Sequence, residues 1–210
     1  MMESKPYVSY TTNLAVDKEI TNGYKSIIEE HILLENSNVL DIGCGTGRLA
    51  AHLSESVNQW CGLDIDSESI ELAKINLKKL KLEDRVTFKV GSFLNIPFDQ
   101  KFDIAISSNS LHFEDNKDGA FKNVYNSLNS GGYFVVFEPT PTPAGWSPDK
   151  LNKSSPNFDP KFFDRKVAEL NNSYAAVRNQ DLFEIIQEVM PNSTTNVEGD
   201  QYHAILRKVK

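Results

Sequence analysis

Cysteine is scarce in this sequence, with Cys44 and Cys61 the only two among 210 residues. Two cysteines are too few for a disulfide framework or a zinc site, so we expect reduced thiols packed as small apolar groups. Three of the histidines, His31, His52 and His203, show no metal-ligand spacing among themselves. The sequence therefore predicts neither redox chemistry nor a bound metal.

Long apolar runs are missing, and basic residues are in the minority. No stretch approaches about 18 uninterrupted apolar residues, and Met1 to Tyr10 lack the basic start and apolar run of a secretory signal. We therefore expect a cytoplasmic protein without a membrane partner. The 22 Lys and Arg against 29 Asp and Glu give a net charge of −7. This deficit disfavours a nucleic-acid partner without excluding one, because binding a polyanion depends on basic side chains displacing counterions.

Short β-rich runs alternate with segments of helical period, within a length that suits one domain. Such alternation predicts parallel strands joined by right-handed crossovers. A last pair of strands, joined around Gly199 and Asp200, predicts an antiparallel hairpin at one edge. The expected fold is α/β, a Rossmann-like, mostly parallel seven-stranded sheet with helices on both faces and an antiparallel C-terminal edge hairpin. The expected strands are Val39–Ile42, Trp60–Leu63, Val86–Val90, Phe102–Ser107, Tyr133–Phe137, Ser193–Val197 and Tyr202–Val209.

The clearest helix signal covers Asp66–Leu80. Asp66 or Ser67 can cap its start, and lysines gather at its end, where they suit the helix dipole. The other expected helices are Asp17–Leu34, Gly47–Ser56, Lys117–Leu128, Phe162–Tyr174 and Gln180–Met190.

Proline is concentrated in one segment, because six of the nine prolines lie between Pro139 and Pro160. This segment follows the carboxyl end of the fifth strand, where open α/β sheets bind ligands, and a loop of this length is usually functional or disordered. We expect a lid on the substrate side, with a surface loop as the alternative. The single domain then divides into an N-terminal cap (1–37), a cofactor-binding core (38–138), a lid-like insertion (139–177) and a C-terminal helix and hairpin (178–210).

A glycine-rich turn, Asp41-Ile42-Gly43-Cys44-Gly45-Thr46-Gly47, stands between the first strand and a helix. Glycines there let the backbone turn sharply and approach a ligand. Asp64 ends the next strand, where a carboxylate reaches ribose hydroxyls. Arg48 occupies the place of the third glycine of a dinucleotide fingerprint, and no Walker lysine follows. The pattern favours a nucleoside cofactor without a phosphate chain.

Several motifs in order resemble class I S-adenosylmethionine-dependent methyltransferases. The segment 39–47 is similar to their first motif, and 62–66 to their ribose motif. Three further segments, 91–98, 102–112 and 128–132, resemble the adenine loop, the fourth-strand motif and the turn into the fifth strand. The resemblance covers residues 38 to 140, and its nearest subgroup is the small-molecule enzymes of the ubiquinone and menaquinone type.

The resemblance implies S-adenosylmethionine as cofactor and assigns roles to individual residues. Asp41 would orient the loop and, through water, the cofactor's amino group. Asp64 would hold the ribose hydroxyls, and Ile65 would pack on adenine. Ser92 stands where the family usually has an acid, so adenine binding loses charge assistance. The implied cofactor-binding residues are Asp41, Gly43, Cys44, Gly45, Asp64, Ile65, Ser92, Phe93, Ser107 and Ser108.

A base is optional in methyl transfer, because the cofactor carries the reactive group and the protein aligns the acceptor. His112, just beyond the fourth strand, is the candidate base, and a structural histidine is the alternative. Glu138 ends the fifth strand and would either fix the lid, which we favour, or bind a substrate amine. Tyr24, like Tyr7 and Tyr10, precedes the core, where N-terminal segments of this family often cover the cofactor.

The acceptor is expected to be a small molecule. The Asn-Pro-Pro-aromatic sequence of amino-methylating nucleic-acid enzymes is absent, since Ser107-Ser108-Asn109-Ser110 occupies its place. Other functions stay open: a methyltransferase acting on a protein or RNA, an S-adenosylmethionine-binding regulatory or scaffold protein without activity, and a nucleotide-dependent oxidoreductase.

Overall fold

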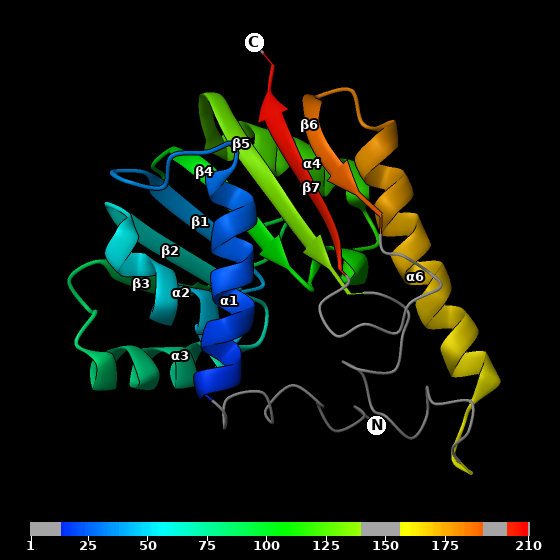
Figure 1. Cartoon of the computed structure of the whole chain (residues 1–210), viewed down its shortest axis with the longest axis horizontal. Helices are drawn as coiled ribbons and strands as arrows, with labels where there is room; N and C mark the ends of the chain where they lie inside the picture. The colour runs from blue at the N-terminus through cyan, green and yellow to red at the C-terminus, as the bar shows by residue number, and fades with distance from the viewer. Residues whose placement is uncertain (1–13, 140–155, 191–200, 210) are drawn as a thin grey trace.

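The computed structural model describes residues 14–139, 156–190 and 201–209, which share one seven-stranded sheet (Figure 1). The strand order is β3-β2-β1-β4-β5-β7-β6. The first five strands are parallel, and β7 runs antiparallel between β5 and β6. This arrangement confirms the predicted Rossmann-like sheet with an antiparallel C-terminal edge. The strands are β1 (Asn38–Ile42), β2 (Gln59–Asp64), β3 (Val86–Val90), β4 (Phe102–Ser108), β5 (Leu128–Glu138), β6 (Phe183–Val189) and β7 (Tyr202–Lys208).

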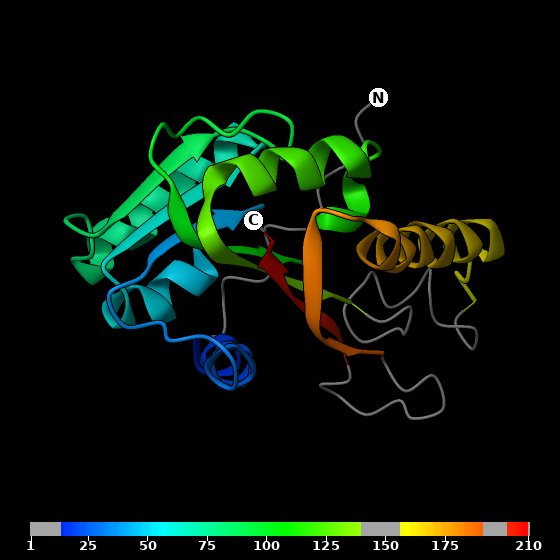
Figure 2. The same ribbon diagram turned by 90° about the horizontal axis from the view of Figure 1, so that it is seen from above.

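Helices cover both faces of the sheet (Figure 2). On one face lie α1, α2 and α3, and on the other lie α4 and α6. In the described part of the chain, no helix is both long enough and apolar enough to cross a membrane. The helices are α1 (Leu14–Glu29), α2 (Arg48–Leu53), α3 (Ser67–Leu80), α4 (Lys117–Ser127) and α6 (Pro160–Asn179), with short 3-10 turns η2 (Ser54–Ser56) and η3 (Leu111–Phe113).

The central strands are buried on both faces, as expected for parallel strands between two helical layers. Successive residues of β1 alternate between the layers: Val39 joins the core under α1 to α3, and Leu40 joins the core under α4 and α6. Both side chains are fully buried, and each such burial contributes about 1.5–3 kcal/mol. Packing in the two cores therefore fixes the positions of β1 and β4, and with them the places where these strands end.

The start of α3 is the predicted one. Asp66 caps the helix by accepting a hydrogen bond from the Glu68 N–H at 3.4 Å, and Ser69 Oγ donates to the same carboxylate at 2.8 Å. Lys81, with a φ of 59°, ends it in the left-handed conformation. The cap fixes the chain just after Asp64, at the carboxyl end of β2.

Phe88 of β3 packs directly over two glycines. A Cβ on Gly62 of β2 would lie 2.5 Å from the Phe88 ring, and a Cβ on Gly47 would lie 2.9 Å from it. Since real Cβ atoms do not approach so closely, both positions require glycine while the ring stands there. This contact brings the glycine-rich loop down onto β2 and β3.

The predicted helix over Gln180–Met190 is wrong, because residues 183–189 form strand β6. Gln180 ends α6 and closes a turn: its Oε1 accepts from the Phe183 N–H at 2.7 Å, and its Nε2 donates to the Phe183 carbonyl at 3.0 Å. Residues 183–189 then pair with residues 203–208 of β7. The outer edge of β7 offers backbone N–H and C=O groups that need hydrogen-bond partners. Within residues 180–190 and 201–209, the chain thus contributes two antiparallel strands and no helix.

Several other element boundaries differ from the predictions. Helix α1 ends at Glu29, five residues before Leu34, and α6 is longer than predicted at both ends. Strand β5 begins at Leu128, although its register against β4 shifts between Phe102 and Ile104. The predicted strand Ser193–Val197 lies outside the described residues, as do Tyr7, Tyr10 and residues 140–155 of the predicted lid.

Candidate functional site

The glycine-rich loop turns back onto the neighbouring strand after β1. The N–H groups of Gly43 and Cys44 both donate to the Leu63 carbonyl, at 2.8 and 2.9 Å. Gly43 has a φ of 76°, and a Cβ there would lie 2.4 Å from the Ser110 side chain. Gly45 has a φ of 53° but opens onto empty space. The loop therefore needs glycine for its backbone at both positions and for close packing at the first.

Asp41 is buried at the end of β1, just before this loop. Burial raises the pKa of its carboxyl to about 7, and the nearby Asp64 adds to this, while the Trp60 indole and Arg48 act in the opposite direction. Among the described residues, its Oδ2 has no hydrogen-bond partner within normal limits. A carboxylate in this state is suited to receive a donor from a ligand or a water.

Asp64 joins the loop to the end of β2. Its Oδ2 accepts from the Gly45 N–H at 2.9 Å, and its Oδ1 accepts from the Asp66 N–H at 2.9 Å. The next side chain, Ile65, is 80% exposed, an unusual state for an isoleucine beside a tightly hydrogen-bonded carboxylate. Asp64 and Ile65 thus present a polar and an apolar group side by side.

The turn after β3 carries Ser92 and Phe93, two of the residues that the resemblance assigns to the cofactor. Ser92 is half-buried, and its Oγ accepts from the Leu94 N–H at 3.2 Å. Phe93 is 5% exposed and packs in the core under α4, while the Asn123 amide holds its carbonyl at 3.1 Å. The Phe93 ring thus lies in the core, and its contact with the cofactor stays a prediction.

The end of β4 is tied to the end of β1 by serines. Ser107 is fully buried, with its Oγ 2.9 Å from Ser110 Oγ. Ser110 Oγ in turn donates to the Ile42 carbonyl at 2.8 Å. Ser108 Oγ accepts from Arg48 Nη2 at 3.3 Å. Ser108 thus contacts a charged group, whereas the Ser107 hydroxyl contacts another serine.

His112 and Glu138 form a buried pair at the carboxyl ends of β4 and β5. His112 lies in η3, and its backbone N–H donates to Glu138 Oε1 at 3.0 Å, while its ring Nδ1 contacts Glu138 Oε2. Ser173 of α6 lies 3.5 Å from the same Oε1, and Tyr174 OH donates to the Pro139 carbonyl at 2.7 Å. Glu138 therefore holds the histidine ring in one orientation, a role the sequence alone did not assign.

Cys44 is a packed thiol within this loop. It is buried, and burial raises its pKa well above the ordinary value, as do the negative charges of Asp41 and Asp64. Burial also raises the pKa of Cys61 to about 11. Both cysteines are free and buried, as expected for reduced thiols packed as small apolar groups.

Two residues at this end of the sheet, Arg48 and Tyr24, do not belong to the implied cofactor-binding residues. Arg48 was noted only as a misfit to the dinucleotide pattern, and Tyr24 only as one of three tyrosines. Arg48 lies over the Tyr24 ring, 5.4 Å from its centroid. Tyr24 stacks on Phe137 at 4.1 Å. The available signal was the charge of Arg48 at the first position after the glycine-rich loop.

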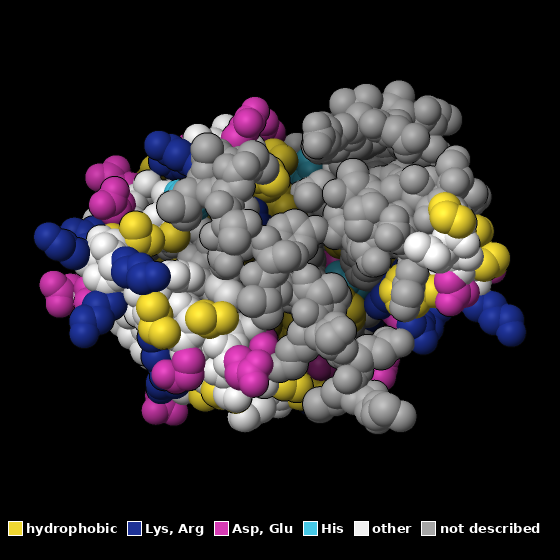
Figure 3. Space-filling model, turned by 90° about the horizontal axis from the view of Figure 1, so that it is seen from below, with side chains coloured by type: hydrophobic (Ala, Val, Ile, Leu, Met, Phe, Trp, Pro, Cys, Tyr) yellow, Lys and Arg dark blue, Asp and Glu magenta, His cyan; other side chains and the backbone are white. Residues whose placement is uncertain are grey.

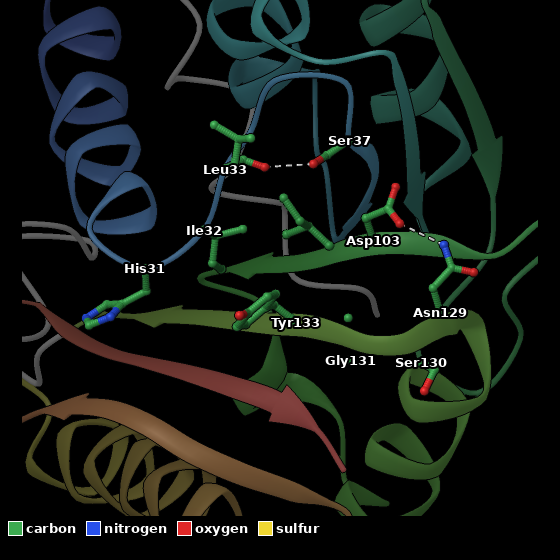
Figure 4. Close-up of a pocket in the computed structure, with 11 residues that line it drawn as sticks. His31, Ile32, Leu33, Ser37, Asp103, Asn129, Ser130, Gly131 and Tyr133 are labelled. Carbon is green, nitrogen blue, oxygen red and sulfur yellow. Dashed lines mark hydrogen bonds between the residues drawn. The ribbon is translucent and has the colours of Figure 1, made fainter. Parts of the chain in front are cut away.

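A separate cavity of about 330 Å³ lies at the opposite end of the sheet, beside the start of β4 and β5 (Figure 4). Its polar side chain Asp103 is already engaged, accepting from the Asn38 N–H at 2.9 Å and from the Asn129 amide at 2.7 Å. Figure 4 shows the Asp103 and Asn129 side chains pointing toward each other. This cavity is remote from the glycine-rich loop and is not part of the candidate site.

The residues that surround the loop fit the nucleoside cofactor that the motifs imply. The unpartnered Oδ2 of Asp41 and the open space over Gly45 mark one end, and the exposed Ile65 beside Asp64 marks the other. Among the residues described, no group of three or more His, Cys, Asp and Glu is arranged to hold a metal ion. The geometry offers a polar and apolar cradle along the carboxyl ends of β1 and β2.

Comparison with known proteins is consistent with this cradle. A family pattern described as a methyltransferase domain matches residues 33–209. The ribosomal protein L11 methyltransferase of Staphylococcus aureus is 32% identical over 137 residues, 64% of this chain and 41% of that protein. The sterol 24-C-methyltransferase of Debaryomyces hansenii is 31% identical over 106 residues, 50% of this chain and 28% of that protein. This chain thus spans less than half the length of either relative.

The fold itself has close counterparts among solved structures. A SAM-dependent methyltransferase from Aquifex aeolicus matches with a TM-score of 0.63 and 15% identity, over 94% of this chain and 99% of that one. At this identity the likeness concerns the fold. The two relatives carry names with different acceptors, a ribosomal protein and a sterol, so the comparisons leave the acceptor class open.

Proposed function

This chain belongs to the methyltransferase domain family, and we propose that it transfers a methyl group from S-adenosylmethionine to an O–H or N–H group of a small-molecule acceptor. The family confirms the expected kind of enzyme domain and its S-adenosylmethionine cofactor. The observation that carries the finer proposal is the buried pair of His112 and Glu138.

Residues of the glycine-rich loop and its neighbours would hold the cofactor. Asp64 would bind the ribose hydroxyls and Ile65 would pack on adenine, while Asp41 would receive the amino group through water. When bound, S-adenosylmethionine supplies a methyl group activated by its sulfonium. The protein's own task is to place an acceptor atom in line with that group.

His112 would take the proton of the acceptor. An ionised Glu138 accepts a hydrogen bond, so Nδ1 carries the ring proton, and Nε2 is then the basic nitrogen. Glu138 also accepts a hydrogen bond from the His112 backbone N–H, which fixes the position of this histidine within η3. A neutral imidazole held this way is suited to remove a proton from a phenol, a quinol, a carboxylic acid or an ammonium group.

A small acceptor is supported by charge. The chain carries a net charge of −7, which opposes a polyanion. Figure 3 views the molecule from below, the side on which β5 ends in Figure 1, and on its described surface acidic and basic side chains are mixed, without a basic patch. The subgroup predicted from the motifs, the ubiquinone and menaquinone type, makes quinols the first acceptors to test.

The test begins with a thermal-shift screen of quinols, phenols, carboxylic acids and amines in the presence of S-adenosylhomocysteine. Compounds that stabilise the protein are then incubated with S-adenosylmethionine, and mass spectrometry detects the methylated product. Methylation of purified ribosomal protein or RNA, with no small molecule methylated, would contradict the proposal.

The role of the pair is tested by H112A and E138Q. His112→Ala should lower turnover by about 10²-fold or more. Glu138→Gln keeps an oxygen for the His112 N–H but turns an amide N–H toward Nδ1, which favours the wrong tautomer, so turnover should fall comparably. Affinity for S-adenosylhomocysteine should stay within a few-fold in both variants. Equal losses of affinity and rate would indicate a structural pair.

A further inference from the structure

The cavity of about 330 Å³ at the start of β4 and β5 lies at an irregular place in the sheet. The pairing of β5 with β4 shifts there, so that four residues, 129–132, stand opposite the single Asp103. Such irregularities redirect side chains and often occur beside active sites. Gly131 and Gly132 line the space and have no side chains that could fill it. The sheet therefore leaves an opening at the end that faces away from the glycine-rich loop.

The charged groups in the lining of this cavity favour a cation. Asp103 is the only acidic side chain there, and apart from His31 no lining residue can carry a positive charge. Asp103 accepts from the Asn38 N–H at 2.9 Å and from the Asn129 amide at 2.7 Å. A carboxylate offers about four acceptor positions, so about two remain. None of the ion pairs in the described part of the chain includes Asp103. Its carboxylate can therefore accept hydrogen bonds from a charged donor.

Apolar groups supply another part of the lining. Ile104 is fully buried, Ile32 is 5% exposed, and Tyr133 contributes a half-buried ring. In Figure 4, Ile32 and Tyr133 lie on one side of the space, and Asp103 and Asn129 lie on the other. A ring face attracts positive charge, and a carboxylate forms strong hydrogen bonds with an ammonium group. The cavity therefore suits a cation with an apolar body, and its volume lies at the lower end of the range for small-molecule pockets.

We propose that this cavity binds a small organic ammonium ion, with Asp103 as its counter-ion and the Tyr133 ring against its apolar body. The hydrogen bonds from Asn38 and Asn129 hold the carboxylate in place, so the site is formed before the ligand arrives. The site lies at the opposite end of the parallel strands from the glycine-rich loop and His112. The proposal is therefore independent of the proposed function, because the ligand is neither the cofactor nor the methyl acceptor.

The test uses three probes of similar shape and different charge: phenethylamine, phenethyl alcohol and phenylpropionate. Binding to the full chain is followed by the chemical shifts of backbone amides in NMR. The amine should bind with a Kd of about 1 mM or lower and shift the amides of residues 31–37 and 129–133. The alcohol should bind at least about 10-fold more weakly, because it lacks the charged hydrogen bond to Asp103, and the carboxylate should not bind there. Failure of the amine to bind, or equal binding of amine and alcohol, would overturn the proposal.

Two substitutions at the cavity and two controls locate the binding. Asp103→Asn keeps an oxygen for the Asn38 N–H but removes the charge, so the affinity for the amine should fall at least about 10-fold. Ser130→Trp, at an exposed lining position, should block binding by filling the space, and it provides the test if Asp103→Asn fails to fold. The matched control Asp84→Asn, at an exposed position, and His112→Ala at the transfer site should both bind the amine as wild type does. Unchanged affinity in the cavity variants would overturn the proposal, and lost affinity in His112→Ala would place the amine at the transfer site instead.

Discussion

Replacing Asp41 by Asn should change how the stability of the protein depends on pH. Asp41 is almost completely buried at the end of β1, and burial raises its pKa from 3.8 to about 7. In the unfolded chain the carboxyl regains its ordinary pKa. Between these two values the folded state binds more protons than the unfolded state, so the contribution of Asp41 to stability falls as the pH rises.

The size of the effect follows from the two pKa values. A difference of one pKa unit corresponds to about 1.4 kcal/mol, so the step from 3.8 to about 7 corresponds to about 4 kcal/mol in full. Part of this loss is already present at pH 5, and the part that develops between about pH 5 and pH 8 is about 3 kcal/mol. Asparagine has no charge to bury, so Asp41→Asn should lack this component.

The assay is urea unfolding of both proteins at several pH values from about 5 to 8. The free energy of unfolding of the variant minus that of wild type should rise by about 3 kcal/mol across the series, since all other titrating groups are shared. If the asparagine amide itself destabilises the fold, it changes the difference in the free energy of unfolding by the same amount at every pH, so the slope against pH stays the same. A difference that stays constant with pH would show that Asp41 is ionised in the folded protein throughout, and the reasoning from burial would be refuted.

Three further substitutions test the cradle. Asp64→Ala should weaken S-adenosylhomocysteine binding by about 1.5–3 kcal/mol in calorimetry, as expected for a charged hydrogen bond. The control, Asp84→Ala at an exposed position, should leave the affinity unchanged. An unchanged affinity in Asp64→Ala would remove Asp64 from the site. Ile65→Ala should weaken the same binding by about 1 kcal/mol and leave the midpoint of urea unfolding nearly unchanged, because the Ile65 side chain is 80% exposed without ligand. A lowered midpoint with unchanged affinity would show that Ile65 stabilises the fold and does not contact the ligand. Gly43→Ala should lower the free energy of unfolding by at least about 2 kcal/mol, and Gly45→Ala should lower it by about 1 kcal/mol. Both glycines have a positive φ, but only a Cβ at position 43 would clash with Ser110. Equal losses in urea unfolding would argue against the close packing at Gly43.

The central part of the fold was predictable because the local sequence there favours the same helices and strands that the packed fold requires. The four strands β1 to β4 are apolar runs bounded by turn residues, and Asp66 is a cap that depends only on its own neighbours. The segment Gln180–Met190 lacks such agreement. Its apolar residues suit a helix as well as a strand, and the choice is made by the free edge of β7, which the local sequence does not reveal.

The site shows the same division. Motif order and spacing assigned the glycine-rich loop and Asp64 to one cofactor site, and the two lie together in the structure, where Asp64 accepts a hydrogen bond from the Gly45 N–H. The contacts of His112 with Glu138 depend on how β5 and α6 close over η3, so spacing alone did not predict them. The burial of Phe93 was not predicted for a related reason, since an aromatic residue in a loop motif has no local signal that tells core from surface.

The Phe88 ring over Gly62 and Gly47 has a consequence for the evolution of this family. Neither glycine can become alanine while the aromatic ring remains, because the added methyl group would lie 2.5 or 2.9 Å from it. A smaller residue at position 88 would remove the ring contact at both positions, but Gly47 would keep its positive φ of 85°, which disfavours any other residue there. Among homologues, positions 62 and 88 should therefore vary jointly, with glycine at 62 wherever 88 is aromatic, whereas position 47 should stay glycine in both cases.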